Sequence, residues 1–216
     1  RFDAADADTA LAQFILSLRA RGVVDRALLI AFETTPRVAF LPRHNPSLMY
    51  APHPLPIDCG AEATAPTVIA QLLGALALKP GMKVLDIGTG SGFQAAVLAR
   101  FGCQVTTIER FETLHLAAAR AMQRQKIVNV RLEHGDGRDG LADGAPYDRI
   151  IVNGALRDVP DALVEQLAPG GTLVAPMMLG REQRLYAFDD AGDAFRQRDL
   201  GRVSFQMLLD GRARAL

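Results

Sequence analysis

Residues 84–93 read VLDIGTGSGF, a short apolar run that ends in a glycine-rich turn. Three glycines alternate there with hydroxyl side chains, as Gly88, Thr89, Gly90, Ser91 and Gly92. Glycine lets a backbone turn tightly and approach a ligand closely, and such turns between a strand and a helix hold nucleotides. The dinucleotide fingerprint requires glycine at position 93, which is Phe93, and a phosphate-binding P-loop requires a lysine that is missing here. The stretch therefore predicts a nucleotide site of another kind.

The chain on both sides of this turn alternates between apolar strands and helical segments. We expect strands at 83–88, 104–109, 130–136, 148–155, 172–178 and 184–190, and a weaker one at about 202–209. Helices are expected at 66–78, 91–102, 113–125 and 161–171. Strands that alternate with helices predict an α/β fold, with a mostly parallel sheet covered by helices on both faces.

The first third of the chain has a different character. Residues 9–34 show helical spacing in two pieces, with a break at Gly22 and a capping residue at Asp25. Residues 37–60 carry five prolines, which predicts an extended segment of the sort that often covers a site. We therefore divide the chain into a helical and proline-rich part, 1–65, packed on a nucleotide-binding domain, 66–216.

Composition excludes several classes of protein. The 216 residues contain 24 Lys plus Arg and 24 Asp plus Glu, so no basic surface for nucleic acid is expected. No apolar run approaches the ~18 residues of a membrane span. Cys59 and Cys103 have no metal-ligand neighbours in the sequence, which predicts reduced thiols in a cytoplasmic protein without a metal site.

Three acids at predicted strand ends narrow the choice of nucleotide. Glu109 ends the second strand, where a carboxylate accepts hydrogen bonds from both hydroxyls of a ribose. Asp86 and Asp136 end the first and third strands and are expected in the same pocket. So much negative charge disfavours a pyrophosphate and favours a ligand with an ammonium and a sulfonium. This points to S-adenosylmethionine, and a nicotinamide dehydrogenase remains a distant alternative.

With these motifs in place, the chain resembles the protein-L-isoaspartate (D-aspartate) O-methyltransferase family from about residue 10 to 209. The resemblance is carried by RARGVVDRALLIAFETTPRVAFLP (19–42), PLPIDCG (54–60), KPGMKVLDIGTGSGFQAAVLA (79–99), GDGRDGLADGAPYDRIIVNGA (135–155) and LVEQLAPGGTLVAP (163–176). It implies a class I S-adenosylmethionine-dependent methyltransferase fold, Rossmann-like and seven-stranded, with an N-terminal helical extension.

The resemblance also implies site residues and a substrate. Cofactor contacts are expected from Gly88, Gly90, Gly92, Glu109, Asp136 and Gly137, together with their neighbours Asp86, Thr89, Ser91 and Arg110. The implied substrate is the abnormal aspartyl carboxylate of a damaged protein or peptide, whose methyl ester begins repair through a succinimide. We expect a monomer or weak dimer.

The departures from the family pattern gather on the substrate side. The family motif G-[QA]-T-I-S-[QA]-P reads GAEATAP at 60–66, so Thr64 stands for the serine and Glu62 for the threonine. Thr64 keeps a hydroxyl that can orient the substrate carboxylate, and it is the predicted catalytic residue. If Glu62 pointed inward about 6 Å from that carboxylate, repulsion would reach roughly 3 kcal/mol at an effective dielectric of 20.

Two further functions stay open at this point. One is an offshoot of the family that methylates another carboxylate or a specific peptide. The other is a protein that binds the cofactor without acting on isoaspartyl residues. Glu62 and Thr64 are the positions that separate these functions from isoaspartyl repair.

Overall fold

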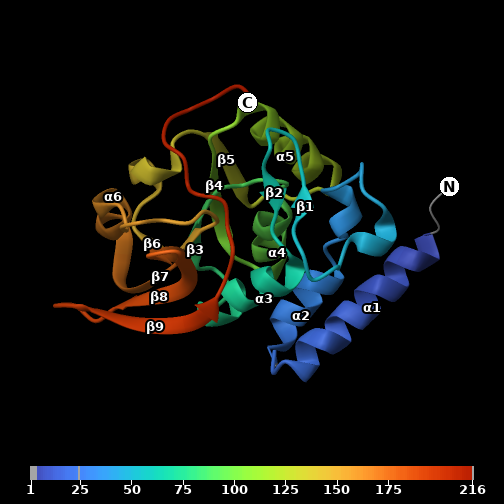
Figure 1. Cartoon of the computed structure of the whole chain (residues 1–216), viewed down its shortest axis with the longest axis horizontal. Coiled ribbons are helices and arrows are strands. Elements are labelled where there is room, and N and C mark those ends of the chain that lie inside the picture. The colour runs from blue at the N-terminus through green and yellow to red at the C-terminus, as the bar shows by residue number, and fades with distance from the viewer. Residues whose placement is uncertain (1–3, 24, 216) are drawn as a thin grey trace.

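A seven-stranded sheet forms the centre of the computed structural model, which describes residues 4–23 and 25–215 (Figure 1). The strand order is β5-β4-β3-β6-β7-β8-β9. Their bounds are β3 Lys83–Ile87, β4 Gln104–Glu109, β5 Val130–His134, β6 Tyr147–Val152, β7 Leu167–Leu179, β8 Glu182–Asp190 and β9 Phe195–Arg202. β3 to β7 are parallel and β8 and β9 are antiparallel, so the predicted mostly parallel, seven-stranded sheet is confirmed.

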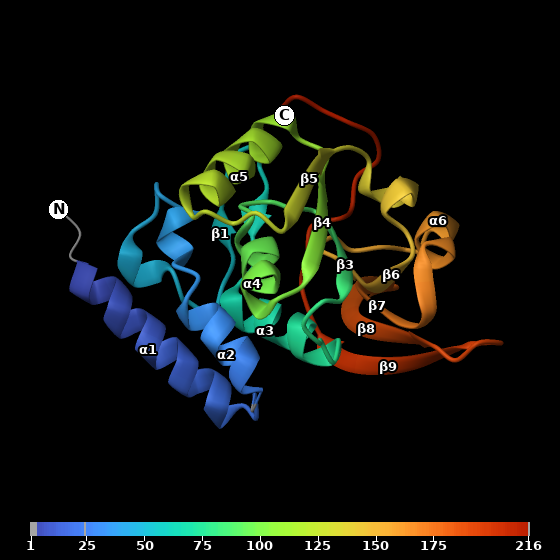
Figure 2. The ribbon, with the colours of Figure 1, turned by 180° about the vertical axis from the view of Figure 1, so that it is seen from behind.

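Helices cover both faces of the sheet, as predicted (Figures 1 and 2). Their bounds are α1 Ala4–Ala20, α2 Arg26–Glu33, α3 Pro66–Ala75, α4 Phe93–Phe101, α5 Glu112–Arg124 and α6 Asp161–Glu165. α3, α4 and α5 lie on one face and α6 on the other. Because successive strand side chains point to opposite faces, Val84 joins the core beneath α4, whereas Leu85 and Ile87 pack with Leu163 of α6.

Of the N-terminal helices, α2 packs against α4, and α1 packs against α2 and the turn at Pro46–Leu48. Asp25 caps α2, because its carboxylate accepts hydrogen bonds from the backbone N–H groups of Ala27 at 2.8 Å and Leu28 at 3.1 Å. The Phe32 ring lies 6.2 Å from the Phe93 ring at the start of α4. The helical extension therefore shares one apolar core with the domain that carries the glycine turn.

The proline-rich segment contains short elements instead of a continuous helix. It forms the 3-10 turns η1 Arg37–Ala39 and η2 Pro46–Leu48, then a small hairpin of β1 Leu55–Pro56 and β2 Glu62–Ala63. Two more 3-10 turns, η3 Gly137–Asp139 and η4 Ala142–Gly144, join β5 to β6. The hairpin brings the altered GAEATAP motif to the end of the sheet where the glycine turn lies.

Two sequence predictions about the C-terminal third are wrong. The last strand is Phe195–Arg202, not about 202–209. Its sequence, FRQRDLGR, is mostly polar because the strand lies at the exposed edge of the sheet, so it lacks the apolar alternation by which a strand is predicted. The helix expected at 161–171 ends at Glu165, and β7 begins at Leu167 and continues through the glycines. The apolar residues beyond β9 therefore belong to an extended C-terminal segment, residues 203–215.

The strand order places a crevice at one end of the sheet. The chain runs outward from β3 through β4 to β5 and then returns to β6 on the other side of β3. In such sheets ligands bind at the carboxyl ends of the strands, where the order reverses. The C-terminal segment crosses this end, since Met207 bridges to Ala155 beyond β6 and Ala213 bridges to Phe111 beyond β4 (Figure 1).

Two further observations concern the part of the chain that the structure describes. It contains no helix with the length and apolar character needed to cross a bilayer. Within the same residues, no group of three or more His, Cys, Asp or Glu side chains is arranged to hold a metal ion. Cys59 and Cys103 are both free thiols, and Cys103 is buried.

Candidate active site

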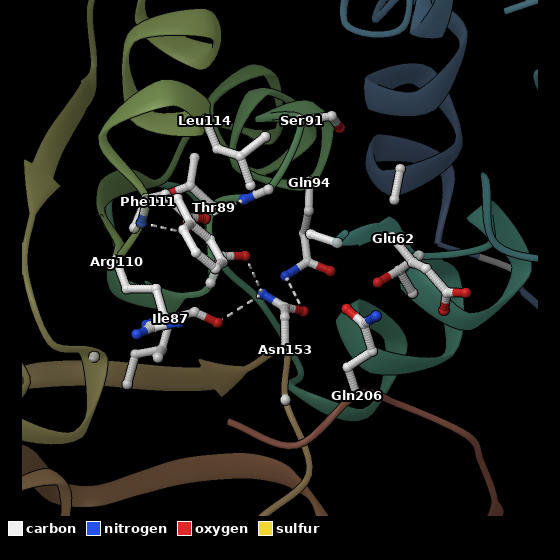
Figure 3. Close-up of a pocket in the computed structure, with 18 of the residues that line it drawn as sticks. Glu62, Ile87, Thr89, Ser91, Gln94, Arg110, Phe111, Leu114, Asn153 and Gln206 are labelled. Atoms are coloured by element: carbon white, nitrogen blue, oxygen red, sulfur yellow. Dashed lines mark hydrogen bonds between the residues drawn. The ribbon is translucent and has the colours of Figure 1, made fainter. Parts of the chain in front are cut away.

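A pocket of about 420 Å³ lies at the carboxyl ends of β3, β4 and β6 (Figure 3). Its volume is in the usual range for a small-molecule site. Eight of the residues predicted from the sequence line it: Thr64, Gly88, Thr89, Gly90, Ser91, Glu109, Arg110 and Gly137. The structure thus brings the glycine turn, the ribose-type acid and the altered substrate motif to one cavity.

Glu109 joins the end of β4 to the glycine turn. One carboxylate oxygen accepts a hydrogen bond from Gly90 N at 2.8 Å, and the other accepts from Phe111 N at 3.0 Å. Gly90 has a φ of 53°, a left-handed conformation that glycine adopts without strain. Each carboxylate oxygen keeps a lone pair for a ligand, so the fixed carboxylate is ready to accept hydroxyl donors.

Asp86 does not line the pocket, contrary to the sequence prediction. Its carboxylate is fully buried and accepts hydrogen bonds from Gln94 Nε2 at 2.7 Å, Thr107 Oγ1 at 2.8 Å and Asn153 Nδ2 at 2.8 Å. Burial raises the pKa of Asp86 to about 6, and the three hydrogen bonds oppose that rise. Asp86 therefore acts on the pocket indirectly, by fixing the amides of Gln94 and Asn153 in its wall.

Asp136 and Gly92 also lie outside the pocket lining. The Asp136 carboxylate accepts from Arg138 N at 2.9 Å and from Gly211 N at 2.5 Å, so it fixes two backbone segments. A Cβ at Gly92 would lie 3.1 Å from Ala118 Cβ, so this glycine allows α4 to pack closely on α5.

The pocket includes residues that sequence reasoning did not assign to it. The most prominent are Arg37, Gln94, Phe111, Leu114, Asn153 and Leu208 (Figure 3 labels Gln94, Phe111, Leu114 and Asn153). Asn153 donates to Ile87 O at 3.1 Å, which places its side chain across the end of β3. Asn153 directly follows β6, which ends at Val152, and ligands gather at strand ends; the predicted strand at 148–155 ran past this position and hid that signal.

The C-terminal segment closes one side of the pocket. Arg110 holds it, because Nε donates to Gly211 O at 3.0 Å and Nη2 donates to Asp210 O at 3.0 Å. Leu208 crosses so close to Gly154 that a Cβ at this glycine would lie 2.9 Å from Leu208 Cβ. The path of this segment therefore requires a residue without a side chain at position 154.

The substrate motif forms the opposite side. Thr64 is half-buried, and its carbonyl oxygen accepts a hydrogen bond from Arg37 Nη2 at 2.9 Å. Glu62 is exposed and stands at the rim, where its neighbour Ala63 is buried. Gln206 Nε2 donates to Gly60 O at 2.8 Å, so the motif is tied to the C-terminal segment across the mouth. Glu62 is thus mostly exposed to solvent, although it also contributes to the lining of the pocket.

Known proteins are similar in sequence to almost the whole of this chain. The sequence pattern of the family described as protein-L-isoaspartate(D-aspartate) O-methyltransferase matches residues 10–213. The protein-L-isoaspartate O-methyltransferase of Maricaulis maris is 40% identical over 209 residues, which are 97% of this chain and 98% of that protein.

Two solved structures have the same fold. A protein-L-isoaspartate O-methyltransferase superposes with a TM-score of 0.85 at 29% identity, and the match spans 91% of this chain and 65% of the other. A putative enzyme of this name from Plasmodium falciparum, in complex with S-adenosyl-L-homocysteine, superposes with a TM-score of 0.79 at 23% identity over 91% of this chain. With the matches in sequence, these findings establish that the chain belongs to the protein-L-isoaspartate (D-aspartate) O-methyltransferase family.

Proposed function

We propose that the protein transfers the methyl group of S-adenosylmethionine to the carboxylate of L-isoaspartyl or D-aspartyl residues in damaged proteins, which initiates their repair. Membership of the family over residues 10–213 is the observation that carries this function. A carboxylate oxygen of the substrate attacks the methyl carbon, the C–S bond breaks, and S-adenosylhomocysteine leaves. No proton moves, so the site requires no general base.

The cofactor side follows from the pocket wall. Glu109 accepts hydrogen bonds from the ribose hydroxyls, while its bond to Gly90 keeps the glycine turn against the ligand. The apolar side chains of Phe111 and Leu114 offer a surface for the adenine. Asp86 serves as a positioning residue through Gln94 and Asn153.

The substrate side depends on orientation. A methyl transfer of this kind is accelerated mainly by holding the two reacting atoms about 3 to 3.5 Å apart and in line. The Thr64 hydroxyl donates to the substrate carboxylate and sets its direction. Its backbone is already held by the hydrogen bond from Arg37, which limits the movement of the motif.

Methyl transfer from labelled S-adenosylmethionine to an isoaspartyl peptide tests this function, with the normal aspartyl peptide as the control. Transfer to the isoaspartyl peptide alone supports repair. Tight binding of S-adenosylhomocysteine without transfer would contradict it and favour the alternative, a member of the family that acts on another carboxylate or none. Binding is measured by calorimetry on the same preparation.

Replacing Thr64 with valine is expected to lower kcat for the isoaspartyl peptide about tenfold to a hundredfold. The lost hydrogen bond goes to a charged group and is worth about 1.5–3 kcal/mol. Thr64→Ser should retain most of the activity, and Thr67→Val, on the first turn of α3, is the matched control. An unchanged kcat in Thr64→Val would remove Thr64 from the mechanism.

Replacing Glu62 with glutamine is expected to change the KM for the peptide less than about threefold. An exposed carboxylate about 6 Å from another charge in water costs only roughly 0.7 kcal/mol. The initial rate is measured against peptide concentration, with Glu33→Gln at the end of α2 as a control. A gain of about thirtyfold or more would mean that Glu62 turns inward when substrate binds.

Three finer expectations remain proposals. We expect a monomer or weak dimer in the cytoplasm. We also expect residues 1–65 to contribute the substrate side and residues 66–216 the cofactor side. Light scattering coupled to size-exclusion chromatography measures the oligomeric state. A substrate peptide that cross-links to the proline-rich segment would support the assignment of the substrate side to residues 1–65.

A further inference from the structure

Arg37 is a buried cation in the wall of this pocket. It begins the short turn η1, its side chain is only 1% exposed, and its guanidinium lies 5.0 Å from the centre of the Phe93 ring. Nη2 donates to Thr64 O at 2.9 Å. Among the residues that the structure describes, Nε and Nη1 have no hydrogen-bond partner. The guanidinium is therefore only partly satisfied by the protein.

The described residues also provide no carboxylate for this charge, since none of their ion pairs involves Arg37. Burial lowers the pKa of Arg37 to about 10, so the group still carries its charge at neutral pH. A buried charge without a partner is strongly destabilising, because its hydration is lost and nothing replaces it. An apolar residue would pack there at lower cost, so the guanidinium requires another explanation.

The ligands of the proposed reaction both supply the missing anion. S-adenosylmethionine carries an α-carboxylate on its methionine part, and the substrate carries the carboxylate that is methylated. Neither acid of the pocket lining pairs with Arg37: Glu109 accepts from Gly90 and Phe111, and Glu62 is exposed at the rim. Planar guanidinium matches carboxylate geometry with two parallel hydrogen bonds, which an ammonium does not.

We infer that Arg37 is the buried counter-ion of a carboxylate bound in this pocket, either that of the cofactor or that of the substrate. The inference rests on the proposed function. Where that carboxylate is the substrate's, Arg37 has two linked tasks, because the same guanidinium holds the backbone of Thr64 and attracts the group that the Thr64 hydroxyl orients.

Ligand pairs that differ only in the carboxylate test the inference. The first pair is S-adenosylhomocysteine and its decarboxylated analogue. The second pair is an isoaspartyl peptide and the same peptide with an amide in place of that carboxylate, and both peptides are titrated into the protein with S-adenosylhomocysteine bound. Affinities are measured by calorimetry for the wild type, Arg37→Met and Arg37→Lys. Arg43→Met is the matched control, since Arg43 follows in the same segment but is exposed and paired with Asp58 at 3.0 Å.

For one of the two pairs, Arg37→Met is expected to reduce the ratio of the affinity for the ligand with the carboxylate to that for the ligand without it about tenfold to a hundredfold. The pair that changes identifies whether the carboxylate belongs to the cofactor or to the substrate. Arg37→Lys should lose less. Equal losses for both members of each pair would overturn the inference and leave Arg37 a structural residue. Because the ratio is taken within one folded protein, a general loss of stability does not mimic the result, and Arg37→Lys serves if Arg37→Met does not fold.

The two proposals fail separately. If the wild type does not methylate the isoaspartyl peptide but Arg37→Met loses discrimination between the two cofactor analogues, the role of Arg37 as counter-ion is supported and the repair function is contradicted. If methylation is found and no pair loses discrimination, only the role of Arg37 as counter-ion is contradicted.

Discussion

Replacing Glu109 with alanine is expected to weaken the binding of S-adenosylhomocysteine several-hundred-fold. The ribose hydroxyls lose a charged acceptor, and hydrogen bonds to charged groups contribute about 1.5–3 kcal/mol each. The substitution also releases Gly90 N, whose bond to the carboxylate is 2.8 Å long, so the glycine turn is no longer fixed for the ligand. Together these losses amount to about 3–4 kcal/mol, which corresponds to several hundredfold in Kd. Calorimetric titration measures the change.

Two variants make this result specific. Glu133→Ala removes a carboxylate from the neighbouring strand, one position away in the register, and should leave the affinity unchanged. Glu109→Gln keeps one acceptor oxygen and should fall between the wild type and Glu109→Ala. A loss of less than about fivefold in Glu109→Ala, in a protein that melts normally, would exclude the ribose contact.

Replacing Asp86 with asparagine is expected to remove a pH dependence from the stability of the protein. Burial raises the folded-state pKa of Asp86 from 3.8 to about 6, so the folded protein binds this proton more tightly than the unfolded chain does. The favourable contribution is fully present below the unfolded pKa and is lost as the pH rises through about 6. The wild type should therefore lose up to about 3 kcal/mol relative to Asp86→Asn between about pH 4 and pH 7.

The hydrogen-bond network can accept the asparagine. Its amide oxygen takes the place that accepts from Gln94 and Asn153, and its amide nitrogen donates to Thr107. Thr107 then donates to Thr89, whose hydroxyl lies 2.7 Å away. Urea unfolding at a series of pH values measures the difference, with Asp148→Asn near the start of β6 as a control. A difference that stays constant across this range contradicts the raised pKa.

The sequence predicted the cofactor side better than the details of its wall. The glycine turn and Glu109 were located because strand periodicity fixes where a strand ends, and the fold then places those ends together. The direction of Asp86 was not predictable in the same way. Every residue of β3 after Lys83 is buried, so the strand shows no alternation that would reveal which side chains face the pocket.

Arg37 and the C-terminal segment were missed for a related reason. Neither has a periodic pattern around it, and their contacts join residues far apart in the chain, as Arg110 and Gly211 are. The apolar residues at 205–209 were interpreted as a strand because an apolar run gives the same signal whether it pairs in a sheet or covers a cavity. Only the path of the chain distinguishes the two.

The pocket is built from parts of the chain that lie far apart in sequence, since Arg37 and Thr64 stand on one side and Gln206 to Leu209 on the other. A chain that is synthesised from its N-terminus folds its early parts first. The glycine turn, the sheet and the proline-rich segment can therefore assemble before the pocket has its last wall. Because a ligand stabilises only the form that binds it, the cofactor is expected to stabilise the docked C-terminal segment.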